Sequence, residues 1–178
     1  LLNNLDLYYL QYALRLKQAG MKNCRLELKW AVIYTLFLLV WMVFERLMGW
    51  HDVHIAKHHL YTLLIYLPTA LVYYLALSDK RNNFYGGIIS FKQAFLSGLV
   101  LTIFIAVLAI PAQYVISTYI TPQYFENVIT YAVQSGKATP EEAASFFNLQ
   151  SYMVQAVAGS LAFGLVLSAL ISIFVRRK

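Results

Sequence analysis

All four histidines of the 178-residue chain fall within nine consecutive positions. No proline or glycine lies between Trp50 and Leu67, so this segment is expected to be helical and continuous with the apolar stretch that follows. On a helix, residues three and seven positions after the first histidine share its face. Imidazole and carboxylate groups clustered in this way are typical ligands of zinc and other transition metals. The candidate metal ligands are therefore His51, His54, His58, Asp52 and Glu45.

The same cluster supports two other interpretations. Imidazole titrates near neutral pH, so these histidines are also suited to sensing pH. Histidine is in addition a comfortable interfacial residue that hydrogen-bonds water and lipid headgroups without any specific function. The HExxH motif of zinc enzymes is missing, because Ile55 occupies the glutamate position between His54 and His58. The sequence leaves these three interpretations open.

No other motif indicates catalysis. The sequence contains no phosphate-binding loop, no dinucleotide-binding glycine motif and no nucleophile elbow. Cys24 is the single cysteine, so a disulfide or CxxC chemistry within the chain is excluded. We therefore expect that the protein is not an enzyme and uses no cofactor.

The composition places these residues in a membrane protein. Hydrophobic residues make up 60% of the chain and charged residues only 12%, whereas soluble domains have about 45–50% and about 25%. Four stretches are apolar over the roughly 20 residues that cross a bilayer. Their apolar character is unbroken rather than alternating, which favours helices over barrel strands. The sequence predicts an all-α, four-helix integral membrane bundle with spans at about 30–49, 60–77, 94–117 and 151–175.

The basic residues predict the orientation. With the N-terminus in the cytoplasm, 11 of the 14 lysines and arginines lie on the inner side and 3 on the outer side, as the positive-inside rule requires. The two sides then carry +8 and −2, which together give the net charge of +6. We expect both termini in the cytoplasm, and we expect no nucleic-acid partner, because the basic residues flank spans.

Small residues recur at every fourth position in the last two spans. Such stripes let membrane helices approach closely, and the simplest arrangement is an antiparallel pair formed by these two spans. A homodimer through one stripe is the alternative. The predicted packing positions are Ala94, Gly98, Thr102 and Ala106 in the third span, and Ala156, Ser160, Gly164, Ser168 and Ser172 in the fourth.

The segment between the third and fourth spans predicts a short extramembrane helical hairpin. Thr121 and Pro122 are typical of a helix start, and Gly136 of a helix end. Thr139 and Glu142 have the spacing of a capping box, which predicts a second helix start. The hairpin is either a structural cap on the bundle or a docking surface for a partner protein.

Residues 1–20 are interpreted separately from residues 21–178, which form the four-span domain. They lack an initiating methionine, and Met21 is followed by polar residues as at a native start. Their apolar residues lie at helical spacing, which is compatible with an amphipathic interfacial helix. The alternative is an extension that is not part of the native protein.

A set of residues spread along the chain carries a resemblance to a known family. It includes Glu45, Gly49, His51, His58, Gly87, the runs 90–95, 97–98, 120–122, 125–127, 135–137 and 141–143, and the run 147–152. By these residues the chain from Met21 onward resembles the small four-span proteins called domain of unknown function 4199, found mainly in Bacteroidota. The resemblance implies an inner-membrane protein of a Gram-negative bacterium with periplasmic outer loops, and it implies no activity and no catalytic residues.

The leading functional prediction is an accessory or scaffold subunit that packs within a membrane assembly or against a second copy of itself. Its support is the small-residue stripes together with the expected absence of buried ionisable side chains. A small transporter or channel component is the second prediction, with a lumen supplied in part by Gln113, Thr102, Gln155 and Ser160. The third is a metal-binding or pH-sensing protein that uses the histidine cluster at its periplasmic face.

Overall fold

The computed structural model describes residues 24–177, and their fold is all-α, which confirms the predicted class. The prediction for residues 1–20 lies outside the described residues. In chain order the helical elements are α2 (Arg25–Leu47), η1 (Ile55–Lys57), α3 (His58–Tyr61), η2 (Thr62–Ile65), α4 (Tyr66–Asn83), α5 (Phe91–Val115), η3 (Ile116–Ile120), α6 (Tyr124–Gln134), α7 (Pro140–Phe146) and α8 (Leu149–Val175).

Four helical runs are long and apolar enough to cross a membrane. Their lengths are 23 to 30 residues and their mean hydropathies 1.7 to 2.5, so each covers the hydrocarbon core at about 1.5 Å per residue. Two of the runs join several elements, since η1 to α4 form one and α5 with η3 another. By length and composition the chain is a multi-pass membrane protein.

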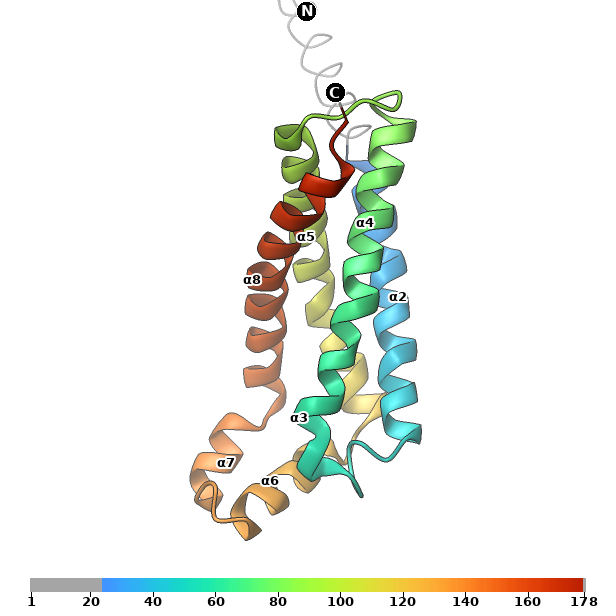
Figure 1. Ribbon diagram of the computed structural model, residues 1–178. Coiled ribbons are helices and arrows are strands. Elements are labelled where there is room, and N and C mark those ends of the chain that lie inside the picture. Colours follow the sequence, from blue (N-terminus) through green and yellow to red (C-terminus); the bar gives the residue numbers. More distant parts are fainter. Residues whose placement is uncertain (1–23, 178) are drawn as a thin grey trace, which may run out of the picture.

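The four long helices form a bundle with two distinct ends (Figure 1). At one end, here called the terminal end, lie the start of α2, the loop between α4 and α5, and the end of α8. At the other end, the hairpin end, lie α3, α6 and α7. Helix α5 packs most extensively against α8 and also against α2, while α4 packs against α8 and α2. Helices α4 and α5 also contact each other, whereas α2 and α8 each pack mainly against these two.

Local capping sets several helix boundaries. Ser90 and Gln93 form a capping box at the start of α5, and Thr139 and Glu142 form the predicted one at the start of α7. Helices α6 and α7 confirm the short helical segment expected between the third and fourth spans. However, α6 begins at Tyr124, rather than at Pro122 with Thr121 as its N-cap, as predicted. The backbone N–H and the hydroxyl of Thr121 both donate to the Ile116 carbonyl, so this residue ends the preceding π-helical turn instead.

The bundle interior is a thin apolar core. Its central cluster combines Ala31 from α2, Tyr73 from α4, Leu101 from α5 and Leu167 from α8, all of them buried. Large apolar side chains on the outer surfaces of the spans stay exposed, including Val40 and Val154. Outward-facing apolar side chains of this kind suit contact with lipid rather than water.

The small residues lie where α5 and α8 meet. A Cβ on Gly98 would lie 2.6 Å from the Ser168 hydroxyl oxygen, and one on Gly164 would lie 2.5 Å from the Thr102 side chain. Among the other predicted packing positions, Ala94, Ala106 and Ser172 are buried, whereas Ala156 and Ser160 are only half-buried. The two stripes are thus used largely within the chain.

Candidate metal site at the hairpin end

Glu45 is a fully buried carboxylate in the last turn of α2. The Trp41 indole donates a hydrogen bond of 2.6 Å to its Oε1 atom. On its Oε2 atom converge the Nε2 atoms of His51 at 3.0 Å and His58 at 3.3 Å. Three nitrogen atoms therefore surround one carboxylate that is itself shielded from solvent.

A glycine turn brings His51 back to Glu45. Gly49 has a φ of +69°, a left-handed conformation that ends α2 and that side-chain-bearing residues rarely adopt. The Trp50 N–H donates to the Glu45 carbonyl at 3.1 Å, and the His54 N–H donates to the Gly49 carbonyl at 2.8 Å. The chain reverses within this turn, so that the His51 imidazole faces the carboxylate six positions earlier.

Helix α6 closes the cluster from the opposite side. The Tyr124 hydroxyl lies 3.3 Å from His58 Nδ1 and 3.2 Å from the Tyr152 hydroxyl. The Asn127 amide donates to the His51 carbonyl at 3.0 Å. Burial, with Tyr152 and Glu45 nearby, raises the pKa of Tyr124. Its phenol is therefore neutral at physiological pH, and it can accept one hydrogen bond while donating another.

The geometry of Glu45, His51 and His58 is close to that of a zinc site. One ligand atom from each lies within 4.8 Å of the other two. Zinc bonds of about 2.0–2.1 Å and tetrahedral angles place neighbouring ligand atoms about 3.3 Å apart, which matches the two histidine–glutamate separations of 3.0 and 3.3 Å. Only the separation of the two imidazoles must shrink for both to bind one ion.

The structure does not bring all five predicted ligands together. Asp52 and His54 are exposed in the turn after α2, away from the cluster. The Asp52 carboxylate accepts from the neighbouring Val53 N–H instead. The predicted helix continuous with the second span is confirmed only from Ile55 onward, where it includes His58. Residues 48–54 form turns, so the predicted helix through His51 and His54 is wrong. His51 and His58 meet through this turn and not through a shared helix face.

Sequence reasoning did not identify Trp41, Tyr124 and Asn127 as partners of the cluster. Trp41 lies four positions before Glu45, so helical spacing was a usable signal for that contact. Tyr124 and Asn127 lie 66 and 76 positions from their partners. No local pattern predicts contacts over that separation.

A large cavity opens beside the cluster. It has a volume of about 1060 Å³ and is lined by residues from α3, α6, α7 and α8, among them His51, His58 and Tyr124. Glu45 does not line it. The two imidazoles thus face the cavity, while the carboxylate lies on the closed side.

A second cavity of about 320 Å³ lies between the four long helices. Its lining residues include Tyr34 from α2, Thr69 from α4, Ala109 from α5 and Gly164 from α8. The two cavities are adjacent, because seven residues line both: Met42, Thr62, Tyr66, Gln113, Ile116, Gln155 and Ala156. We call the larger one the outer cavity and the smaller one the bundle cavity.

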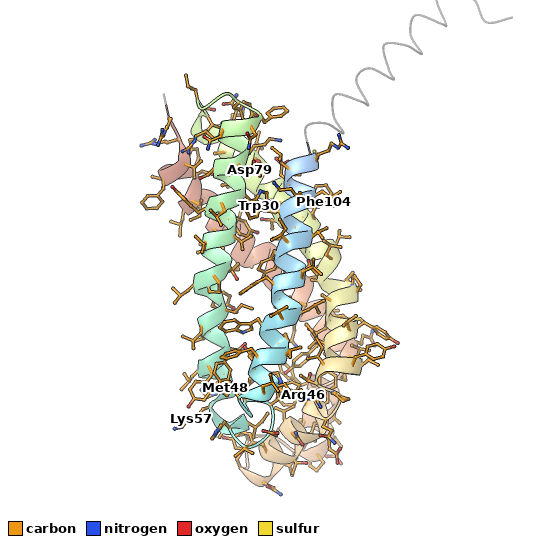
Figure 2. All side chains as sticks on the ribbon, turned by 90° about the vertical axis from the view of Figure 1, so that its right-hand side faces the viewer. Trp30, Arg46, Met48, Lys57, Asp79 and Phe104 are labelled. Carbon is orange, nitrogen blue, oxygen red and sulfur yellow. The ribbon has the colours of Figure 1, made fainter. Side chains whose placement is uncertain are left out.

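Buried charges at the terminal end contradict the expected absence of buried ionisable side chains. Glu27 in α2 and Lys80 in α4 form an ion pair of 2.9 Å and are 5% and 2% exposed. The Ser97 hydroxyl of α5 donates to the same carboxylate at 2.5 Å. The pairing offsets the cost of burying both charges. In the same region, the Lys29 ammonium and the Trp30 indole both donate to the Asp79 carboxylate, and Figure 2 shows Trp30 and Asp79 near this end.

The fold and the site define an all-α, multi-pass membrane protein with a buried carboxylate and imidazole cluster at one end of its bundle. A family model described as protein of unknown function (DUF4199) matches residues 29–177, so the chain belongs to this family. This confirms the resemblance drawn from the sequence. No curated protein and no solved structure matches the chain. A function must therefore be argued from the residues themselves.

Proposed function

We propose that the protein binds a divalent transition metal, with zinc the best fit, through Glu45, His51 and His58. The observation that carries this proposal is the convergence of three ligand atoms within 4.8 Å of one another. Two imidazoles and one carboxylate form a donor set that zinc commonly uses. The function is one of binding, and we assign no catalytic residue.

The surroundings of the cluster support a metal site. Metal-bound histidines usually donate their second N–H to a polar partner, which fixes the ring and raises its affinity. For His58 the Tyr124 hydroxyl is in that position. Tyr124 in turn lies within hydrogen-bond distance of Tyr152 on α8. The His51 Nδ1 atom is buried without a partner among the described residues.

The orientation predicted from the basic residues places the site on the periplasmic side of a bacterial inner membrane. Arg25, Lys92 and Arg177 belong to the terminal end, whereas Arg46, Lys57 and Lys137 belong to the hairpin end. Figure 2 shows Arg46 and Lys57 together at the end opposite Trp30. The positive-inside rule assigns the terminal end to the cytoplasm.

The scaffold function predicted from the sequence has less support than metal binding. The α5–α8 contact already occupies much of the small-residue stripes, and Glu27 and Lys80 are buried ionisable groups. The transporter function is a second candidate, because Gln113, Gln155 and Ser160 of the predicted lumen do line the bundle cavity. Thr102, the fourth predicted lumen residue, does not line it.

Zinc affinity of the purified full chain, measured by competition with a chromophoric chelator, tests the metal proposal. Replacing a ligand in Glu45→Gln or His58→Ala should weaken binding at least tenfold, since losing even a group that only orients a ligand typically costs 10–100-fold. His54→Ala is the matched control, because His54 is exposed and outside the cluster. Its affinity should equal that of the wild type.

Two results contradict the metal proposal. One is a wild-type protein that takes up no zinc in stoichiometric amounts. The other is equal loss of affinity in His54→Ala and His58→Ala, which indicates unspecific binding by surface histidines. Circular dichroism of each metal-free variant separates loss of ligands from loss of fold.

A further inference from the structure

We infer that the outer and bundle cavities together bind an amphiphilic monocarboxylate, an inference that rests on the proposed metal site. Its carboxylate completes the coordination of the metal, and its apolar chain extends between the four long helices. Three features lead to this ligand: the open side of the metal site, the charge that the site would have with a metal bound, and the extent and lining of the two adjacent cavities.

The protein supplies three ligands, and zinc takes a fourth. Glu45 lies on the closed side of the cluster, and His51 and His58 both line the outer cavity. The remaining coordination position of a metal held by these three therefore faces the cavity. Zinc sites with three protein ligands keep that fourth position for water or for an exchangeable ligand.

The charge of the occupied site selects a monoanion. A divalent ion with one carboxylate and two neutral imidazoles has a net charge of +1. The charged side chains that line the outer cavity beyond the histidines, Lys137 and Glu142, have opposite signs. A single carboxylate on the ligand neutralises the centre, whereas a doubly charged phosphate monoester leaves an excess negative charge in a largely buried space.

The two adjacent cavities together extend far along the bundle, and charged side chains line only the outer one. Along α8 the lining runs from Tyr152 in the outer cavity to Gly164 in the bundle cavity, about 18 Å of helix at 1.5 Å per residue. None of the residues that line the bundle cavity is ionisable in the neutral range, and apolar side chains such as Leu38, Ile105 and Phe163 form much of its wall. This end suits an uncharged hydrocarbon chain longer than that of octanoate.

Co²⁺ in place of zinc makes the inference measurable, because its visible absorption changes when a ligand enters its coordination shell. The probes are octanoate, butyrate and the neutral octanamide, added to the Co²⁺-loaded full chain in detergent. Octanoate should change the Co²⁺ band with a Kd at least tenfold below that of butyrate. Octanoate has four more methylene groups than butyrate, and burying each one lowers the Kd by at most about fourfold. The expected tenfold ratio is well below the limit that these four groups set together. Octanamide should leave the band unchanged.

A substitution between the two cavities tests where the hydrocarbon chain of the ligand lies. Ala156 lines both cavities, so Ala156→Phe should bring the octanoate and butyrate Kd values within twofold while the Co²⁺ band persists. Val154→Phe is the matched control on the same helix, because Val154 is 63% exposed and lines neither cavity. This control should keep the tenfold preference.

The outcomes separate the two proposals. A protein that takes up no Co²⁺ overturns the metal site and this inference together. Co²⁺ uptake without any response to octanoate, or with an equal response to octanamide, overturns the inference and leaves the metal site standing. Equal Kd values for octanoate and butyrate in the wild type show that only the carboxylate is recognised. This result overturns the assignment of the ligand's hydrocarbon chain to the bundle cavity.

Discussion

At the scale of single residues, Glu45 has an unusual position for a carboxylate. It lies in the last turn of α2, where the helix dipole disfavours negative charge, and it is fully buried. Trp41, His51 and His58 supply the hydrogen bonds that offset this cost. A divalent ion bound at the proposed site would supply a larger compensation, so metal binding should stabilise the hairpin end most.

The ion pair of Glu27 and Lys80 gives a residue-scale prediction. Glu27→Gln keeps the shape of the side chain but leaves Lys80 buried without its carboxylate, which typically costs about 3–5 kcal/mol. The free energy of unfolding in mixed SDS micelles should fall by that amount. The double variant Glu27→Gln with Lys80→Met removes both charges and should recover at least half of the loss. A double variant no more stable than the single one argues against charge burial as the cause.

At the scale of elements, the pairing of α5 with α8 rests on glycines that leave room for side chains of the partner helix. Thr102 and the Tyr73 hydroxyl occupy the space in front of Gly164, and Ser168 occupies the space in front of Gly98. The serines and the threonine satisfy their own hydroxyls by donating to carbonyls one turn earlier in the same helix. The two helices therefore approach each other closely. The hydroxyl groups of Thr102, Ser168 and Ser172 all keep a hydrogen-bond partner in this interface.

Two glycines of α8 provide a matched pair of substitutions for this interface. Gly164→Ala places a methyl group 2.5 Å from Thr102 and should destabilise the bundle by about 1–3 kcal/mol. Gly159→Ala meets nothing within 4 Å and should be neutral or stabilising, by up to about 1 kcal/mol. Unfolding titrations of both variants check this difference. If they lose equal stability, close approach at Gly164 is not what holds α5 to α8.

The elements themselves were largely predictable, and the site was predictable only in part. Unbroken apolar runs fixed the four spans, and the spacing of Thr139 and Glu142 fixed the start of α7, because both signals are local. The spacing argument placed His54 with the ligands and assumed a helix there. Gly49 overrides that helix with a left-handed turn. Tyr124 and Asn127 reach the cluster only through the tertiary arrangement, which no single-sequence pattern encodes.

At the scale of the whole molecule, both described ends of the chain and the α4–α5 loop lie together, opposite α6 and α7 (Figure 1). An even number of spans requires this arrangement. The distribution of basic residues predicts which end faces which compartment. The proposed metal site and the outer cavity lie toward the hairpin end. The orientation of the protein in the membrane therefore decides which compartment supplies the metal and the ligand.

Single-cysteine labelling tests the orientation. In a Cys24→Ser background, Lys137→Cys places a thiol at an exposed position of the hairpin end, and Lys92→Cys places one at an exposed position of the terminal end. A membrane-impermeant maleimide should label only Lys137→Cys in intact spheroplasts and both after lysis. Labelling of Lys92→Cys alone in intact spheroplasts reverses the proposed orientation.

The ligand cluster and helix α6, which packs over it, are far apart in the sequence. This separation has a consequence for biosynthesis. Glu45, His51 and His58 leave the ribosome with the first two spans, whereas Tyr124 follows His58 by 66 residues. At about 5–20 residues per second this interval lasts roughly 3 to 13 s. During that time the nascent chain presents its two imidazoles and its carboxylate without α6 above them. Insertion of the third span and the synthesis of α6 therefore set the moment at which the cluster is enclosed.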